Sequence, residues 1–468
     1  MANRRSQILA GGVVILALLY FAAPRAAAQQ PGISQSAGDP AAHPPAVASY
    51  TLEDLKQMAL AHNPTLAQAQ AEIQSSEGRK LQSGLYPNPT AGYIGEQIRG
   101  GAERGGEQGF FVQQDIVLGG KLGLNRKIFE RERQQALAES AEQRLRVTTA
   151  VQLYFLRALA TQETVGVRRH LVQLANEAVK TSRQLFNVGE ADRPDVLEAE
   201  VQAQQAQLAL SAAEQDQQGI WQALAATVGL PNLPMAPLAG NLETFGSLDR
   251  ATWLARMLED SPAVKIAELG VQKAEAVLAR ARREPIPNLE LRAGIEQNRE
   301  LSEFSGKPIG LEGFATVGVQ IPLFDRNQGN IEAARARLDR ARSEVERVRL
   351  VLRERAAPVF QNYATALDAV TRYQNQILPR AREAYQMYLK NYQEMAAAYP
   401  QVLIAQRTLF QLEDADIVAL ENLGASAIAL NSFLLTDGLE APTPADRINH
   451  PVREIDLPSG MAGTTRQE

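Results

Sequence analysis

The chain has 468 residues, a formal net charge of −5 and no cysteine. The lack of cysteine excludes disulfides, thiolate metal sites, catalytic thiols and a lipid-modified N-terminal cysteine. The sequence has no cluster of Lys and Arg interleaved with aromatic residues, which argues against nucleic acid as a partner. The length suits two or three ordinary domains or one long duplicated unit.

The N-terminus has the pattern of an export signal. Arg4-Arg5 precede a mostly apolar run from Ile8 to Ala23, and Ala26-Ala27-Ala28 supply an A-x-A cleavage site. We therefore predict a signal peptide over 1–28, with a membrane anchor as the alternative that the short run disfavours. Residues 29–49 are rich in Pro, Ala, Ser and Gln, which predicts a disordered leader. No later apolar run reaches about twenty residues, so a membrane role would require strands.

Next come two short helices that begin at Thr51 and at Pro64. Thr51 to Asp54 has the form of a capping box, and Pro64 follows a break at His62-Asn63. Similar landmarks recur near Ser247 and at Pro262, at an offset of about 198 residues. After each helix pair, a proline-punctuated turn leads into segments rich in Gly, aromatic and β-branched residues. We predict four strands there, over 90–99, 110–118, 289–299 and 314–324, with polar Gly-rich loops over 100–109 and 300–313.

Each pair of strands is followed by a very long helix, over about 125–187 and about 330–394. Gly166, Pro358 and Pro379 predict bends or short breaks in these helices. The first helix ends at a hairpin tip, because Gly189 is typical of a left-handed C-terminal cap. Asp192, Pro194 and Asp195 are typical of the start of the returning helix.

The returning helix carries an apolar heptad seam, and a second seam follows about 206 residues later. The first seam is Val196, Ala199, Ala203, Ala206, Leu210, Ala213, Ile220 and Leu224; the second is Val402, Ala405, Leu409, Leu412, Ala419, Leu423 and Leu430. We infer a duplicated coiled-coil hairpin, with chance amphipathic helices as the alternative. The predicted repeats span 50–228 and 248–436, with a linker over 229–247 and a flexible tail over 437–468.

Strands of about ten residues have the length of transmembrane β-strands. Four such strands cannot close a barrel within one chain, and an open edge in lipid leaves unsatisfied backbone groups. Several copies must therefore pool their strands if the segments span a membrane. A soluble β-hairpin is the alternative that the strand segments alone leave open.

The order of these elements resembles the TolC-like outer membrane efflux proteins over about residues 50–436. The tip segments Phe186 to Gly189 and Pro194 to Leu197 resemble that family's first periplasmic tip. Leu118 to Lys121 and Ile321 to Gly329 resemble the heavy-metal branch, of cobalt-zinc-cadmium type. The resemblance implies a mainly α fold with a small membrane β part. Duplicated helical hairpins would form an α-barrel, and four strands per chain would join a twelve-stranded β-barrel in a homotrimer.

The resemblance also implies the partners and the location. A periplasmic adaptor (membrane fusion) protein and an inner membrane pump of RND type would dock at the tips of a channel held in outer membrane lipid. The channel would be a passive exit duct in the cell outer membrane with a large periplasmic part. The adaptor-docking candidates are Asn187, Val188, Gly189, Asn391 and Tyr392.

Carboxylates cluster at the first tip, and a threefold assembly would repeat them around one axis. A ring of carboxylates at a narrow mouth attracts cations. The gate candidates are Glu190, Asp192, Asp195, Glu198 and Gln401, where Gln401 and Ile404 stand at second-tip positions that are acidic in many relatives. Ordinary helix N-terminal acids are the alternative explanation for Asp192 and Asp195.

No enzyme motif or metal-ligand motif occurs: there is no Walker loop, G-x-S-x-G or H-E-x-x-H, and the four histidines lie far apart in sequence. We expect no enzyme, no cofactor and no tight metal site. The predicted cargo is heavy-metal cations, and the alternative is drugs, other small molecules or polypeptides. A periplasmic coiled-coil structural or adhesion protein is the alternative of another class.

Overall fold

The computed structural model describes residues 49–96, 98, 106–189, 191–242, 248–301, 305–394 and 399–443. The chain divides into two units, 1–47 and 48–468, and every described residue belongs to the second. The predicted signal peptide, all but the last residue of the leader, and Glu190 lie outside the described residues.

The described part of the first repeat contains four helices. They are α1 (Leu52–His62), α2 (Pro64–Ser83), α3 (Lys121–Asn187) and α4 (Arg193–Val228). The capping box predicted at Thr51 is present, because the Thr51 hydroxyl accepts from the Asp54 N–H while Asp54 accepts from Thr51. Asn63 caps α2 through the Thr65 N–H at 3.0 Å. Local side-chain caps therefore separate α1 from α2, as the sequence predicts.

The second repeat follows the same order. Its helices are α5 (Arg250–Asp260), α6 (Pro262–Arg283), α7 (Gln328–Arg372), α8 (Leu378–Gln393) and α9 (Tyr399–Asn431). The helix predicted over 330–394 is divided by a π-helical turn over Tyr373–Ile377. Pro379 has no N–H for the carbonyl four residues earlier, and the wider turn accommodates that loss. Pro358 stays inside α7 without ending it.

Four antiparallel strands form one sheet in the order β2-β3-β5-β6. Their bounds are β2 (Thr90–Glu96), β3 (Glu107–Ile116), β5 (Leu289–Leu301) and β6 (Pro308–Val319). The strand predicted over 314–324 was therefore placed six residues too late. Leu311 pairs with Gln297, so part of the predicted Gly-rich loop is strand, and the strand ends before Pro322, which has no N–H for a ladder.

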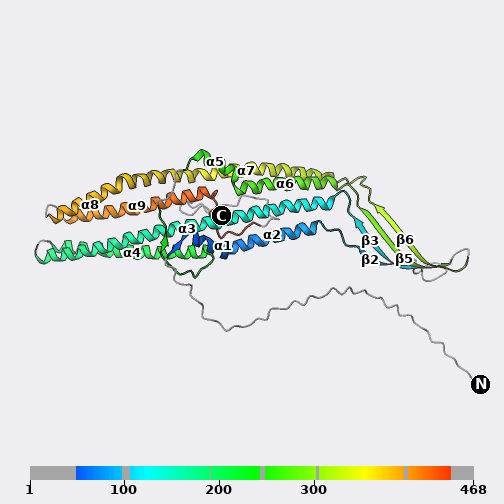
Figure 1. Ribbon diagram of the computed structural model, residues 1–468, viewed down its shortest axis with the longest axis horizontal. Coiled ribbons are helices and arrows are strands. Elements are labelled where there is room, and N and C mark those ends of the chain that lie inside the picture. Colours follow the sequence, from blue (N-terminus) through cyan, green and yellow to red (C-terminus); the bar gives the residue numbers. More distant parts are fainter. Residues whose placement is uncertain are drawn as a thin grey trace, which may run out of the picture. The chain divides into compact units, whose positions relative to one another are not determined.

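The sheet lies at one end of the helices, and the α3/α4 and α8/α9 ends lie at the other (Figure 1). Helix α3 contacts α2, α4, α6 and α9, while α7 contacts α6 and α9. The main core joins both repeats where the short helices meet the long ones, and its fully buried side chains include Leu55, Leu224, Met257 and Leu430. Among the described helices, none combines the length and the apolar character that a membrane crossing requires.

Two segments outside the predicted repeats are tied to this core. Leu238–Ala239, in the predicted linker, form β4 and pair in parallel with β1 (Tyr50–Thr51). Residues 437–443, assigned to a flexible tail by the sequence, lie against the first repeat. Gln143 donates to the Glu440 carbonyl at 3.0 Å, and the Thr443 N–H donates to Glu139 at 2.9 Å. Residues 444–468 lie outside the described part of the chain.

Candidate functional site: the helical tips and the strand face

The first tip begins where α3 ends at Asn187. The Val188 N–H donates back to the carbonyls of Gln184 and Leu185, and Gly189 adopts a φ of +82°. A left-handed residue at this position favours glycine, as predicted. Val188 is 72% exposed. Asn187 and Val188 therefore present a polar and an apolar side chain to the solvent at the end of the hairpin.

The predicted gate acids lie at the start of α4. Asp192 is its N-cap, and the Asp195 carboxylate accepts a 3.1 Å hydrogen bond from the Asp192 N–H. Asp195 therefore has a structural role as a helix-capping residue. Glu198 is exposed one turn further along the helix. These three acids lie within two turns of α4, and Glu190 lies outside the described residues.

The seam behind this tip buries small side chains. Val196, Ala199, Ala203 and Ala206 are all buried, and Ala203 and Ala206 pack on Ala175 of α3. Small residues allow the two helices to approach closely. Arg183 of α3 and Glu200 of α4 form an exposed ion pair of 2.7 Å across the same hairpin. The hairpin is thus held by packing along its seam, with exposed pairs contributing little.

The second tip is described on both of its helices but not across the turn. Asn391 is exposed and Tyr392 is partly buried near the end of α8, and burial raises the pKa of the Tyr392 hydroxyl. Gln401 is exposed in the first turn of α9, and Ile404 is 57% exposed beside it. Residues 395–398 lie outside the described part. Both tips lie at the same end of the helices (Figure 1).

Two ion pairs that the sequence analysis missed join the repeats between α3 and α9. Arg168 pairs with Asp414, and Arg157 pairs with Glu421 at 3.5 Å. Burial raises the pKa of both carboxyls, and the neighbouring guanidinium only partly opposes it. No local pattern identifies such pairs, because their members lie in different repeats.

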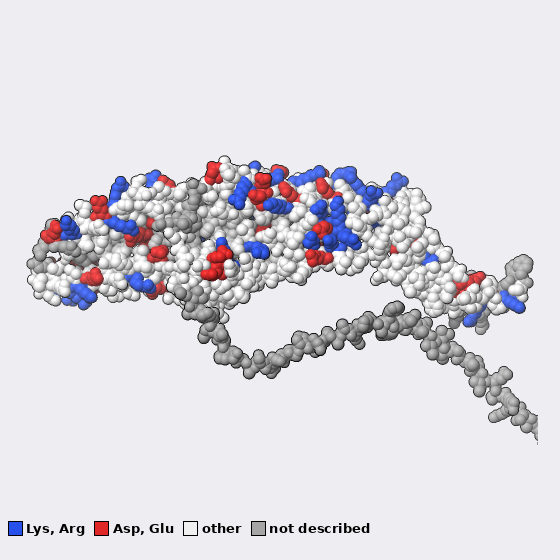
Figure 2. Space-filling model, in the orientation of Figure 1, with Lys and Arg blue, Asp and Glu red and all other residues white. Residues whose placement is uncertain are grey.

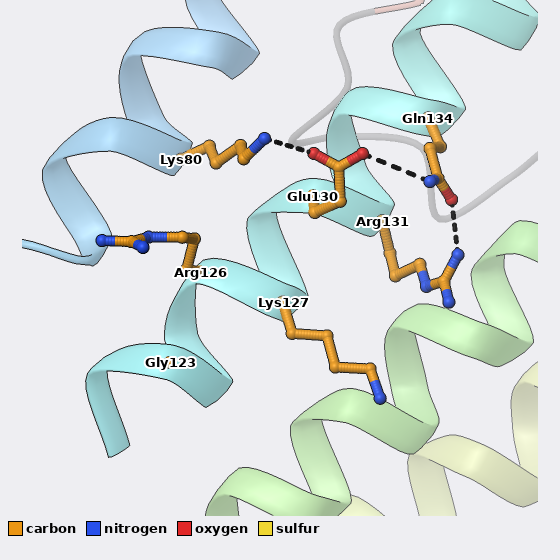
Figure 3. A pocket seen from close by; sticks show the side chains of 7 residues that line it. All are labelled: Lys80, Gly123, Arg126, Lys127, Glu130, Arg131 and Gln134. Carbon is orange, nitrogen blue, oxygen red and sulfur yellow. Dashed lines mark hydrogen bonds and ion pairs between the residues drawn. The ribbon is translucent and has the colours of Figure 1, made fainter. Parts of the chain in front are cut away.

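Basic side chains gather where α2, α3 and α6 approach the sheet (Figure 2). A shallow depression there is lined by Lys80, Gly123, Arg126, Lys127, Glu130, Arg131 and Gln134 (Figure 3). Arg133 and Lys80 hydrogen bond to the Glu130 carboxylate and lower its pKa to about 2. The lining contains four basic side chains and this one carboxylate, so the depression has a net positive charge.

The four strands divide their side chains between two faces. Register partners Tyr93 and Phe110 lie on one face together with Val112, Ile295 and Leu311, and all five are exposed. The opposite face is polar: it carries Glu96, Glu107, Asp115, Glu290, Glu296, Asn298 and Glu312. Asn298 donates to Glu107 at 2.8 Å and to Glu312 at 3.2 Å. An apolar face and a polar face on one short sheet are typical of strands that separate lipid from water.

Within the described residues, no group of three or more His, Asp or Glu has the geometry to hold a metal ion. The described residues form helical tips, long helices and an amphipathic sheet. An amphipathic sheet at one end of long helical hairpins is the architecture expected of a membrane-associated conduit protein.

The family model "Outer membrane efflux protein" matches residues 55–230 and 253–434, and the chain belongs to this family. It is 28% identical to the cobalt-zinc-cadmium resistance protein CzcC of Cupriavidus metallidurans, over 78% of this chain and 85% of that protein. It is 29% identical to the nickel-cobalt-cadmium resistance protein NccC of Alcaligenes xylosoxydans xylosoxydans, over 63% of this chain and 66% of that protein.

The fold matches a solved structure of CusC with a TM-score of 0.66 at 16% identity, over 82% of this chain and 91% of that chain. This confirms the predicted mainly helical, TolC-like fold with one four-stranded antiparallel sheet. The protein is an outer membrane efflux channel of the TolC-like family and not an enzyme.

Proposed function

We propose that three copies of this chain assemble into the exit duct of a tripartite efflux pump. The observation that carries this proposal is the open four-stranded sheet. Strands β2 and β6 are its two edges, and one of its faces is apolar and exposed. Lipid cannot satisfy the backbone groups of an open edge. Pairing β6 of one copy with β2 of the next would satisfy both edges and close a ring of twelve strands.

The helices support the periplasmic part of the same proposal. Helix α3 has 67 residues, which corresponds to about 100 Å at 1.5 Å per residue. Such a length carries the tips far from the membrane-embedded sheet. A periplasmic adaptor and an inner membrane pump of RND type would dock there, at Asn187, Val188 and Gly189 of the first tip and Asn391 and Tyr392 of the second. Residues 1–28 would direct export and then be removed.

The proposed cargo is divalent heavy-metal cations. The supporting observation is that CzcC and NccC are metal resistance proteins by name and match most of this chain. A passive duct needs no tight metal site, because selection and energy coupling take place in the pump. Deleting the gene should lower tolerance to cobalt, zinc or cadmium. Unchanged metal tolerance with lowered drug tolerance would instead assign the channel to drug export.

We further propose that the tip acids form a cation-attracting ring. Asp192, Asp195 and Glu198 are exposed, and three copies would place nine carboxylates around one axis. Such a ring concentrates cations at the entrance and repels anions. Glu190 would add to the ring, whereas Gln401 and Ile404 leave the second tip uncharged at the matching positions.

The ring can be tested by the reversal potential of the channel in a planar bilayer under a salt gradient. The wild type should be cation-selective, and Asp195→Asn with Glu198→Gln should lower that selectivity. Glu259→Gln is the matched control, because this exposed acid lies in α5 and away from the tips. If all three proteins conduct with the same reversal potential, the proposed acidic ring is wrong, whereas the proposed channel is not contradicted.

A further inference from the structure

The polar face of the sheet carries one basic side chain. Between the helix-side strand ends and Asn298, the described strands contain a single Lys or Arg, which is Arg292 of β5. On that face Glu290 lies two residues before Arg292, and Glu296 and its register partner Glu312 lie four residues further along the sheet. A single guanidinium in an acidic surface strongly changes the electrostatic potential at its own position along the strands.

Arg292 is held between two aromatic rings. Its guanidinium carbon lies 4.1 Å from the centroid of the Phe111 ring and 5.8 Å from that of Phe314. Phe111 belongs to β3 and Phe314 to β6, so the three side chains extend across three adjacent strands. Stacking on aromatic faces fixes the position of a guanidinium while it keeps its charge.

Two glycines make room for these rings. A Cβ atom at Gly92 would lie 2.6 Å from the Phe111 ring, and one at Gly294 would lie 2.6 Å from the Phe314 ring. Gly92 pairs with Phe111, and Gly294 pairs with both Phe111 and Phe314. Each ring therefore lies flat across a neighbouring strand. The rings and Arg292 together form a continuous layer from β2 to β6.

We propose that Phe111, Arg292 and Phe314 form a cationic belt that sets the charge preference of the strand-lined part of the passage. This inference rests on the proposed trimer, in which the polar face lines the passage and the apolar face meets lipid. Three belts would then place three guanidiniums at one level. The acids Glu96, Glu107, Glu296 and Glu312 lie between that level and the loops joining the strand ends. A permeating ion would meet opposite charges in sequence.

The chain has no native cysteine, so a single introduced thiol can report the local potential. Thr316 is the register partner of Arg292 and lies on the same face. In the detergent-extracted Thr316→Cys protein, the rate of modification is measured with an anionic and with a cationic methanethiosulfonate reagent. Replacing Arg292 by Gln should lower the anionic-to-cationic rate ratio by roughly tenfold. Arg292→Lys should keep the ratio, because the charge is retained.

Ser211→Cys in α4 is the matched control, because its rate ratio should not respond to Arg292→Gln. Native mass spectrometry of the same samples reports the assembly. If the protein is a trimer and the anionic-to-cationic rate ratio of Thr316→Cys is unchanged by Arg292→Gln, the proposed belt is wrong, but the proposed channel is not contradicted. A chain that is not trimeric overturns the proposed assembly and the belt with it.

Discussion

The Asp195 carboxylate accepts a 3.1 Å hydrogen bond from the backbone N–H of Asp192, at the tip where α4 begins. One proposed gate acid is therefore also a capping residue. Removing its charge and removing its hydrogen bond are different perturbations, and an alanine substitution combines them.

We expect Asp195→Ala to destabilise the first turn of α4 by about 1 kcal/mol, the usual cost of a lost cap. Asp195→Asn removes the charge and keeps an oxygen acceptor, so it should cost only a small fraction of the free energy that Asp195→Ala costs. Amide hydrogen exchange of residues 193–198 measures the difference. Equal protection in the two variants would show that Asp195 does not cap the helix in solution.

The Glu130 carboxylate links pH to stability near the sheet. Its pKa is lowered from 4.5 to about 2, because Arg133 and Lys80 hydrogen bond to the ionised form. A lowered folded-state pKa stabilises the fold above the unfolded value, and that contribution is lost as pH falls from 4.5 towards 2. Glu130→Gln should therefore be less stable than wild type at pH 6, and the gap should close near pH 2. The midpoint temperatures of thermal unfolding of the two proteins, compared across this pH range, measure the difference in stability. A difference that does not change with pH would contradict the lowered pKa of Glu130.

The Arg168–Asp414 pair lies between the repeats, with side chains 30% and 19% exposed. Burial raises the pKa of Asp414, so its ionisation opposes folding, and stability falls as pH rises through that raised value. Arg168→Ala should cost about 2 kcal/mol, less than a fully buried broken pair because Arg168 is partly hydrated.

Adding Asp414→Asn to Arg168→Ala should restore much of the stability, because the uncompensated carboxylate is then gone. A double-mutant cycle of unfolding midpoints measures this coupling. Additive effects of the two substitutions would mean that the residues do not interact.

Gly229 and Gly189 both end helices with positive φ, +86° and +82°, but their surroundings differ. A Cβ at Gly229 would lie 2.6 Å from the His62 carbonyl oxygen, whereas nothing lies within 4 Å of one at Gly189. Gly189→Ala should cost about 1 kcal/mol of backbone strain, and Gly229→Ala clearly more because α1 must also move. Thermal denaturation measures the loss of stability in each variant. Equal losses would argue against the close contact between Gly229 and the His62 carbonyl.

Local signals were predictable from the sequence, and contacts between distant residues were not. The Thr51 capping box, the Gly189 stop and the break at Pro379 each depend on residues within one or two turns, so the sequence predicted them correctly. The start of β6 was missed because Pro308, Gly310 and Gly313 are typical of loops, although pairing with β5 keeps them in a strand. The heptad seams predicted which faces of α4 and α9 are buried.

The repeat architecture was inferred from landmarks that recur along the chain, and the acids of the first tip from their local clustering in the sequence. The Arg168–Asp414 pair and the stacking of Arg292 on Phe111 were not inferred, because both join residues that only the folded chain brings together. Strand alternation could have placed Phe111 and Arg292 on one face, but only the register between β3 and β5 shows that they are neighbours.

The central claim is that three chains close one passage, and native mass spectrometry of the protein extracted from outer membranes tests it most directly. The account predicts a complex of three times the mass of the mature chain, with no appreciable monomer at detergent concentrations that preserve the fold. A folded monomer, or a complex whose mass is not three chains, would contradict it.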